Sequence, residues 1–392
     1  MIKRVNFNFL FFLKLLFIPV LYELVIGGSG HYLEFGPVTF RMVSYLLAIF
    51  LAIIYYLNKK VIRKDVSIIL ILFSVTLILS SIIGCINNAR LDLILEDLKP
   101  LIFFYILLFF SIVVKDIRDI KKISKIIKNG SLILGLIYIL VVLLLFTGKI
   151  NFTTFYQQQS EIGEVMFRNE TLFFYKGFLY LCVGYFFFLL SEGRKNKLGA
   201  LFLFICIILT LTRGFILFTV LITGYYIFFI NKNAVVKWIV FLFGIIAFTI
   251  LVPILLETLG DKSDSDSSRY LQINEVIAAI NPISFIIGHG FGVGVKSREI
   301  HMELSFLEIF HKQGIIGLAF WIALFIFIFL SYMKIKIKTY KKIALPFLLS
   351  VVFIILQSTT NPYMNNPIGL MIILISIVVF SKLLELQKNI TL

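Results

Sequence analysis

The amino-acid sequence predicts an all-α, polytopic membrane protein with about twelve transmembrane helices and a large helical extracytoplasmic loop. Of its 392 residues, 60% are hydrophobic and only 15% are charged, whereas soluble domains carry about a quarter charged residues. Apolar runs of about 18 residues recur along the whole chain, and a helix of that length crosses a hydrocarbon layer of ~30 Å. The basic residues gather on alternate connecting segments. These observations exclude a soluble globular protein.

The boundaries of the spans follow from the apolar runs. The first run follows Lys3 and Arg4 and has no small-residue cleavage site, so we expect an uncleaved membrane helix rather than a signal peptide. The stretch from Leu198 to Ile230 has Arg213 as its one charged residue and would be about 50 Å long as a single helix. Two spans that meet in a tight turn at Arg213 fit a bilayer better. The expected spans are 7–27, 39–57, 66–86, 100–114, 130–148, 171–190, 198–212, 214–230, 238–256, 314–333, 343–361 and 366–383.

The formal net charge of +16 is explained by the side of the membrane on which the charges lie. With the N-terminus in the cytoplasm, the cytoplasmic segments hold about twice as many Lys and Arg residues as the outer segments, and most acidic residues fall outside. This bias predicts a plasma-membrane protein with both termini in the cytoplasm and no nucleic-acid partner. The sequence has no glycine-rich phosphate loop, which argues against chemistry powered by ATP.

Two outer segments are long enough to carry a site, a loop near 149–170 and a much longer loop at 257–313. They divide the chain into spans 1–9 (1–256), the large extracytoplasmic loop, and spans 10–12 (314–392). Within the large loop, the polar run 261–268 has acidic spacing that hints at calcium, but it lacks the glycine and distal glutamate of an EF-hand. We interpret it as a solvated hinge, followed by a short surface helix that ends at Asn281-Pro282.

The run Gly288-His289-Gly290-Phe291-Gly292 is a second candidate feature of this loop. Alternate glycines permit positive φ, so that backbone amides can face an anion or a sugar. A glycine-rich turn is more often simply a turn. Gly288, His289 and Gly290 are nevertheless candidate contacts to a glycan or phosphate, as are the following cationic residues, Lys296 and Arg298.

The segment 301–313 is predicted to form an amphipathic helix that leads into the tenth span. At 100° per residue, His301, Glu308 and Lys312 share one face, whereas Glu303 lies about 200° from His301. His301 and Glu303 could serve one site if His301 stood in the turn before the helix. A histidine on the polar side of such a helix is often merely solvated, and Glu308 with Lys312 could be no more than an i,i+4 pair.

Arg213 has two open interpretations. An arginine at the apex of an apolar hairpin either extends its side chain to the outer interface or binds an anion there.

Taken in order, these features resemble the O-antigen polymerase and O-antigen ligase superfamily, over roughly residues 200–330. The resemblance rests on the turn 212–214, on Arg269 at the start of the outer loop, on Asn281-Pro282 followed by the run 288–292, and on the segment 301–317. It implies an inverting glycosyltransferase that needs neither metal nor cofactor. The donor would be an undecaprenyl-diphosphate-linked glycan on the outer face of a bacterial plasma membrane.

The resemblance also implies roles for individual residues. Arg213 and Arg269 match the arginines that hold the donor diphosphate, and guanidinium groups suit phosphate oxygens. His301 matches the proposed catalytic base, with Glu303 as its nearest rival. Ligases of this superfamily usually have asparagine directly after that histidine, whereas this chain has Met302.

Met302 therefore favours a polymerase, which joins lipid-linked repeat units into a surface polysaccharide such as O-antigen or capsule. A ligase that transfers finished polysaccharide is the alternative, and a polysaccharide or lipid-linked oligosaccharide transporter is a third hypothesis from a different class. The partners implied are the undecaprenyl-diphosphate-linked glycan, membrane lipid, a chain-length regulator and a flippase.

Overall fold

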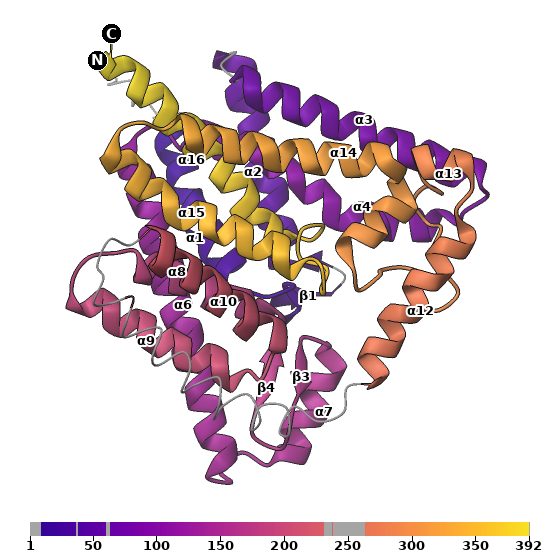
Figure 1. Cartoon of the computed structure of the whole chain (residues 1–392), viewed down its shortest axis with the longest axis horizontal. Helices are drawn as coiled ribbons and strands as arrows, with labels where there is room; N and C mark the ends of the chain where they lie inside the picture. The colour runs from indigo at the N-terminus through magenta and orange to yellow at the C-terminus, as the bar shows by residue number, and fades with distance from the viewer. Residues whose placement is uncertain (1–8, 37, 60–62, 231–236, 238–262, 392) are drawn as a thin grey trace, which may run out of the picture.

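The computed structural model describes residues 9–36, 38–59, 63–230, 237 and 263–391 (Figure 1). Helices dominate these residues, which confirms the all-α fold class. The helices are α1 (Phe9–Ile26), α2 (Phe40–Lys59), α3 (Lys64–Ile86), α4 (Leu91–Ile102), α5 (Ile106–Val113), α6 (Ile117–Phe146), α7 (Phe152–Ile162), α8 (Leu179–Leu189), α9 (Arg194–Leu209), α10 (Arg213–Tyr225), α12 (Ser263–Ala279), α13 (Pro282–Ile287), α14 (Ser305–Lys334), α15 (Lys338–Gln357) and α16 (Pro367–Thr391).

Two short antiparallel hairpins accompany the helices. In the first, β1 (Glu34–Phe35) pairs with β2 (Val38–Thr39), and in the second, β3 (Val165–Phe167) pairs with β4 (Phe173–Tyr175). The second hairpin extends into the expected span 171–190, so that only α8 remains helical there. The sequence did not indicate this hairpin, because its aromatic residues read equally well as the start of an apolar helix.

Eight helices of the described residues are long and apolar enough to cross a membrane. They are α1, α2, α3, α6, α14, α15, α16 and the combined segment Arg213–Ile230. The expected span 100–114 is divided between the end of α4, a 3₁₀ turn and α5. The expected span 198–212 corresponds to α9, and the expected span 238–256 lies outside the described residues. The total of twelve therefore stays a prediction.

The core of the molecule surrounds α16, which packs against α1, α5, α14 and α15. Along one edge of the bundle, α3 and α14 run side by side (Figure 1). Large apolar side chains such as Leu46, Phe50, Ile71 and Ile78 are exposed on α2 and α3. Such surfaces suit contact with lipid tails. A polytopic all-α membrane protein accounts for both the buried centre and the apolar exterior.

Charged residues within the first span are paired with other elements. Glu23 forms a buried ion pair with Arg41 at the start of α2 (2.8 Å), and Lys14 binds Asp119 in α6 (2.7 Å). Ionisable groups at membrane depth are costly unless they are paired. These two contacts therefore fix α1 against its neighbours.

Two expectations about the large loop need correction. The run 263–268, interpreted as a solvated hinge, forms the first turns of α12, while 261–262 lie outside the described residues. An i,i+3 ion pair between Asp266 and Arg269 (3.0 Å) supports helix there. The expected amphipathic helix begins at Ser305 instead of His301, so His301 and Glu303 lie in the preceding turn.

Other local expectations are confirmed. The chain turns between α9 and α10, as expected from the position of Arg213. The surface helix α12 ends before Asn281, whose side chain then caps α13 by accepting hydrogen bonds from the amides of Ile283 and Ser284. Asn281-Pro282 is therefore both the end of one helix and the start of the next.

Candidate functional site

The glycine-rich turn between α13 and α14 is packed against the end of α3. Asn87 Nδ2 donates a hydrogen bond to the carbonyl oxygen of His289 (2.7 Å). Gly290 has a φ of +87°, and a Cβ atom added to it would lie 2.0 Å from the backbone nitrogen of Gly84. The glycines thus permit a close approach of two backbones.

The amides proposed to face an anion donate instead to backbone carbonyls within the protein. Each of the three candidate positions has such a partner: Gly288 donates to Ser284 (2.8 Å), His289 to His311 (2.8 Å) and Gly290 to Lys312 (3.0 Å). This geometry favours the simpler interpretation, in which the turn positions the first half of α14.

The first half of α14 carries a buried cluster of charged side chains. Lys312 Nζ lies 2.6 Å from Asp97 Oδ1 and 2.8 Å from Glu308 Oε1, and all three side chains are buried. Asp97 comes from α4 and also accepts a hydrogen bond from the amide of Gly292 (2.8 Å). Asn365 Nδ2 donates to the second oxygen of Glu308 (2.6 Å). Every member of the cluster therefore has a polar partner, as burial requires.

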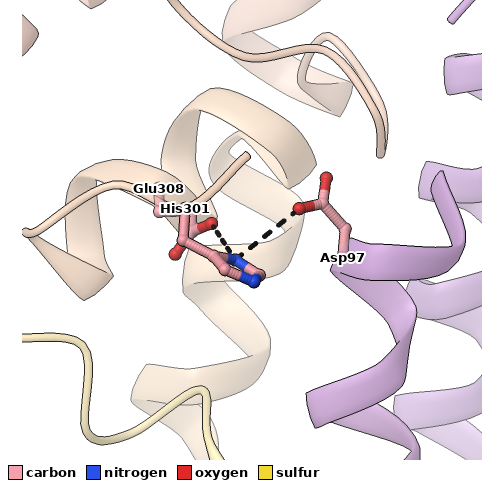
Figure 2. A group of neighbouring side chains, drawn as sticks. All are labelled: Asp97, His301 and Glu308. Carbon is pink, nitrogen blue, oxygen red and sulfur yellow. Dashed lines mark ion pairs between the residues drawn. The ribbon is translucent and has the colours of Figure 1, made fainter. Parts of the chain in front are cut away.

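His301 lies at the edge of this cluster. Its Nδ1 atom is 3.5 Å from Glu308 Oε1 and 3.9 Å from Asp97 Oδ1 (Figure 2). The imidazole is 48% exposed, whereas the carboxylates are buried. One face of the ring therefore meets buried negative charge while the ring stays accessible. A small pocket lies here, lined by His301, the three cluster residues and the side chains of Pro100, Leu101, Phe291, Ile309, Gln313 and Asn365.

The ligand atoms of Asp97, His301 and Glu308 all lie within 4.8 Å of one another, a spacing that could hold a metal ion. Lys312 Nζ, however, binds both carboxylates and already supplies the positive charge between them. A metal ion would have to displace that ammonium group. Burial raises the pKa of Asp97, and the adjacent Lys312 charge opposes this shift. The residues present thus fit a charge-compensated acid–base cluster better than a metal centre.

A second group of charges surrounds Glu303. One carboxylate oxygen lies 3.1 Å from Arg269 Nε in α12, and the other lies 3.0 Å from Arg298 Nη2. Met302, between His301 and Glu303, is buried against Val276 and Val295. The alternation directs residue 302 into the loop and the residues on either side of it toward the polar surface. The structure thus brings Arg269, Arg298, His301 and Glu303 into one region.

The comparison with known proteins agrees with this arrangement. The chain is 30% identical over 382 residues to an O-antigen polymerase from Shigella flexneri, and the match covers 94% of this chain and 95% of that protein. The chain belongs to the O-antigen polymerase family. No family model matches the sequence. Membership fits a multi-pass membrane protein with a glycosyltransferase-type activity.

In this O-antigen polymerase family member, Arg213 begins α10 on the other side of the loop that joins α15 to α16. Tyr363 of that loop packs on Phe215 in the first turn of α10, with ring centroids 6.0 Å apart. Ser305, at the start of α14, donates a hydrogen bond to Asn365 Oδ1 of the same loop (3.1 Å). The loop therefore connects the arginine-bearing end of α10 with the cluster around Glu308.

Arg168, which the sequence reading did not single out, accompanies Arg213. Its guanidinium lies over the ring of Phe174, 5.8 Å from the centroid, and Phe174 packs on Phe215 at 5.6 Å. Burial, and then the charge of Arg213, lowers the pKa of Arg168. Within the described part of the chain, its buried Nε atom has no hydrogen-bond partner. Two guanidinium groups thus share one partly buried region beside the β3–β4 hairpin.

Proposed function

We propose that this protein joins undecaprenyl-diphosphate-linked oligosaccharide repeat units into a surface polysaccharide, O-antigen or capsule, on the outer face of the bacterial plasma membrane. The likeness to the Shigella flexneri O-antigen polymerase supports this reaction. The observation that carries the assignment of the site is the accessible His301 imidazole, whose Nδ1 faces two buried carboxylates.

His301 is the proposed general base. With Nδ1 directed toward Glu308 and Asp97, Nε2 is the ring atom that accepts the proton of an acceptor hydroxyl. The hydroxyl oxygen then attacks the anomeric carbon of the donor, while the bond from that carbon to the diphosphate breaks and the diphosphate leaves with the electron pair. This displacement inverts the anomeric configuration. The carboxylates orient the imidazole and stabilise the imidazolium that forms.

Glu303 is the weaker candidate for this role. Both of its oxygens are bound to guanidinium groups, those of Arg269 and Arg298. Such contacts favour the charged carboxylate and reduce its tendency to take up a proton. We therefore place Glu303 as the residue that holds Arg269 in position.

Arg213 and Arg269 are the proposed ligands of the donor diphosphate, with Arg168 as a third. Guanidinium groups bind phosphate oxygens in pairs of hydrogen bonds and stabilise the charge that grows on a departing diphosphate. Lys296 and Arg298 are exposed beside the same loop and are proposed contacts to the glycan. The mechanism proposed here uses protein side chains alone, with no metal ion and no cofactor.

The proposed orientation has both termini in the cytoplasm and the segments 149–170 and 257–313 outside, between the membrane parts 1–256 and 314–392. The distribution of basic residues supports it. A flippase and a chain-length regulator are proposed partners, since repeat units must reach the outer leaflet before they are joined there.

The test is in vitro polymerisation. Purified protein in detergent is incubated with undecaprenyl-diphosphate repeat units in the presence of a metal chelator, and the products are separated on a gel. We expect a ladder from the wild type, from Glu303→Gln and from the control His31→Ala, which alters an exposed histidine outside the site. His301→Ala should lower the rate by about 10² or more.

Each alternative has its own result in this assay. A ladder from His301→Ala at the wild-type rate would remove His301 as the base, and its loss in Glu303→Gln alone would move the role to Glu303. Folded wild-type protein that makes no ladder would favour a ligase or a transporter, since neither polymerises repeat units that are already lipid-linked.

A further inference from the structure

A second hollow lies at the opposite ends of α3 and α14 from the His301 cluster. It is formed where α3 begins and where α14 and α16 end, and its charged lining consists of Arg63, Lys64, Asp65, Lys334, Glu385 and Lys388. The length of α3 separates it from the glycine-rich turn by about 35 Å, since an α-helix rises 1.5 Å per residue. The hollow therefore takes no part in the chemistry proposed above.

The hollow has an excess of positive charge. Its two acidic residues are already engaged: Asp65 binds Arg63 (2.8 Å) and accepts a hydrogen bond from Ser381 (2.6 Å), and Glu385 binds Lys382 (2.6 Å). In the described part of the chain, the exposed ammonium groups of Lys64 and Lys334 form neither a hydrogen bond nor an ion pair with a protein group.

The surroundings add to this positive charge. Burial lowers the pKa of Lys115, which precedes α6, and the neighbouring charges of Lys382, Arg63 and Lys14 lower it further. Basic residues at the cytoplasmic ends of spans can serve only to set topology. Here they come from helices that are far apart in the sequence and line one concave surface, which topology alone does not require.

We propose that this hollow binds the phosphate group of an anionic phospholipid in the cytoplasmic leaflet. Basic pockets between transmembrane helices on that side suit acidic headgroups. A lipid is favoured over a free phosphate ion because the apolar side chains of Ile68, Leu330 and Met333 are exposed on α3 and α14 close to the hollow. Acyl chains can lie along these side chains while the headgroup meets Lys64 and Lys334.

The experiment titrates the purified full-length protein, in neutral detergent, with phosphatidylglycerol and counts bound lipid by native mass spectrometry. The test variant is the double substitution Lys64→Gln with Lys334→Gln. The matched control is Lys121→Gln with Lys122→Gln, which removes the same charge from exposed residues of α6 that do not line the hollow. Phosphatidylcholine serves as the neutral lipid, and inorganic phosphate as a competitor.

We expect the test variant to bind phosphatidylglycerol about tenfold more weakly than the wild type, since each cation near an acidic headgroup contributes about 1 kcal/mol. The control variant should bind like the wild type, and phosphatidylcholine should bind weakly to all three proteins. All altered residues are exposed, so unfolding temperatures should stay within a few degrees and confirm folding.

Three results would overturn the proposal. The first is equal binding of phosphatidylglycerol to the test and control variants. The second is equal binding of both lipids to the wild type. The third is displacement of phosphatidylglycerol by inorganic phosphate at a comparable concentration, which would identify a site for the free ion. None of these results depends on polymerisation, so the proposed reaction is tested separately.

Discussion

Lys312 Nζ and Asp97 Oδ1 lie 2.6 Å apart, although 215 residues separate the two in the sequence. Asp97 comes from α4, while Lys312 follows Glu308 by one helical turn in α14. The contact joins the N-terminal half of the chain to the segment that carries His301. The position of the proposed base therefore depends on a pairing between distant parts of the protein.

Removing Lys312 should be more costly than removing Asp97. Lys312→Met leaves two buried carboxylates without a cation, and a broken buried pair costs about 3–5 kcal/mol. Asp97→Asn leaves Lys312 paired with Glu308, so its cost should be smaller. Thermal unfolding in detergent gives the order. Lys99→Met, which removes an exposed lysine of the same helix, should change the unfolding temperature little. The reverse order for Lys312 and Asp97 would contradict the assigned charges.

Arg168 should affect donor binding rather than the chemical step. A hydrogen bond to a charged group contributes about 1.5–3 kcal/mol, so Arg168→Gln should raise the KM for the lipid-linked donor about tenfold or more. The rate at saturating donor should change less. The control Arg194→Gln alters an exposed arginine at the start of α9. Initial rates over a range of donor concentrations decide the matter, and an unchanged KM would remove Arg168 from the diphosphate site.

Gly84 should not tolerate a side chain. A Cβ atom at this position of α3 would lie 2.1 Å from the carbonyl oxygen of Phe291, so Gly84→Ala must shift the glycine-rich turn. Overpacking of this kind typically costs about 1–3 kcal/mol. Gly224→Ala is the matched control, since it also lies in a helix and its added Cβ atom meets nothing within 4 Å. Gly84→Ala should unfold at lower temperature and polymerise more slowly, whereas Gly224→Ala should do neither.

Glu275 should make the outer loop sensitive to acid. The hydroxyl and the amide of Ser297 both donate to its carboxylate, and these bonds lower the pKa of Glu275. The folded state therefore holds this proton less tightly than the unfolded state, and the contribution to stability is present above the unfolded value of about 4.3 and is lost as the pH falls. Glu275→Gln should unfold earlier than the wild type at neutral pH. The two unfolding temperatures should converge below about pH 4, and a constant difference would exclude this cause.

The local features of the sequence predicted much of the fold. The turn at Arg213 was predicted because a lone charge cannot remain at the centre of a bilayer, and the helix boundary at Asn281-Pro282 followed from capping preferences. The start of α14 was placed four residues early. The period of polar and apolar residues continues through His301, and periodicity alone does not show where a helix begins.

The site was predicted less completely, for a physical reason. His301, Glu303 and Arg269 were found because the resemblance includes them. Asp97 was missed because it lies close to an apolar run, and its partner Lys312 is in contact only after α4 and α14 have packed. Arg168 was missed in the same way, since its relationship to Arg213 is created by the aromatic contact between Phe174 and Phe215.

Gly314 interrupts α14 with a φ of +63° and a ψ of −162°, directly after the residues that carry the buried charges. The short helix that bears Glu308 and Lys312 and the long helix that follows are thus two rods joined at one residue. Bilayer thickness sets the tilt of the long rod through hydrophobic mismatch. Because the hinge lies between them, the short rod keeps its alignment with α4 when the long rod tilts. The chemistry is in this way insulated from changes in the thickness of the surrounding membrane.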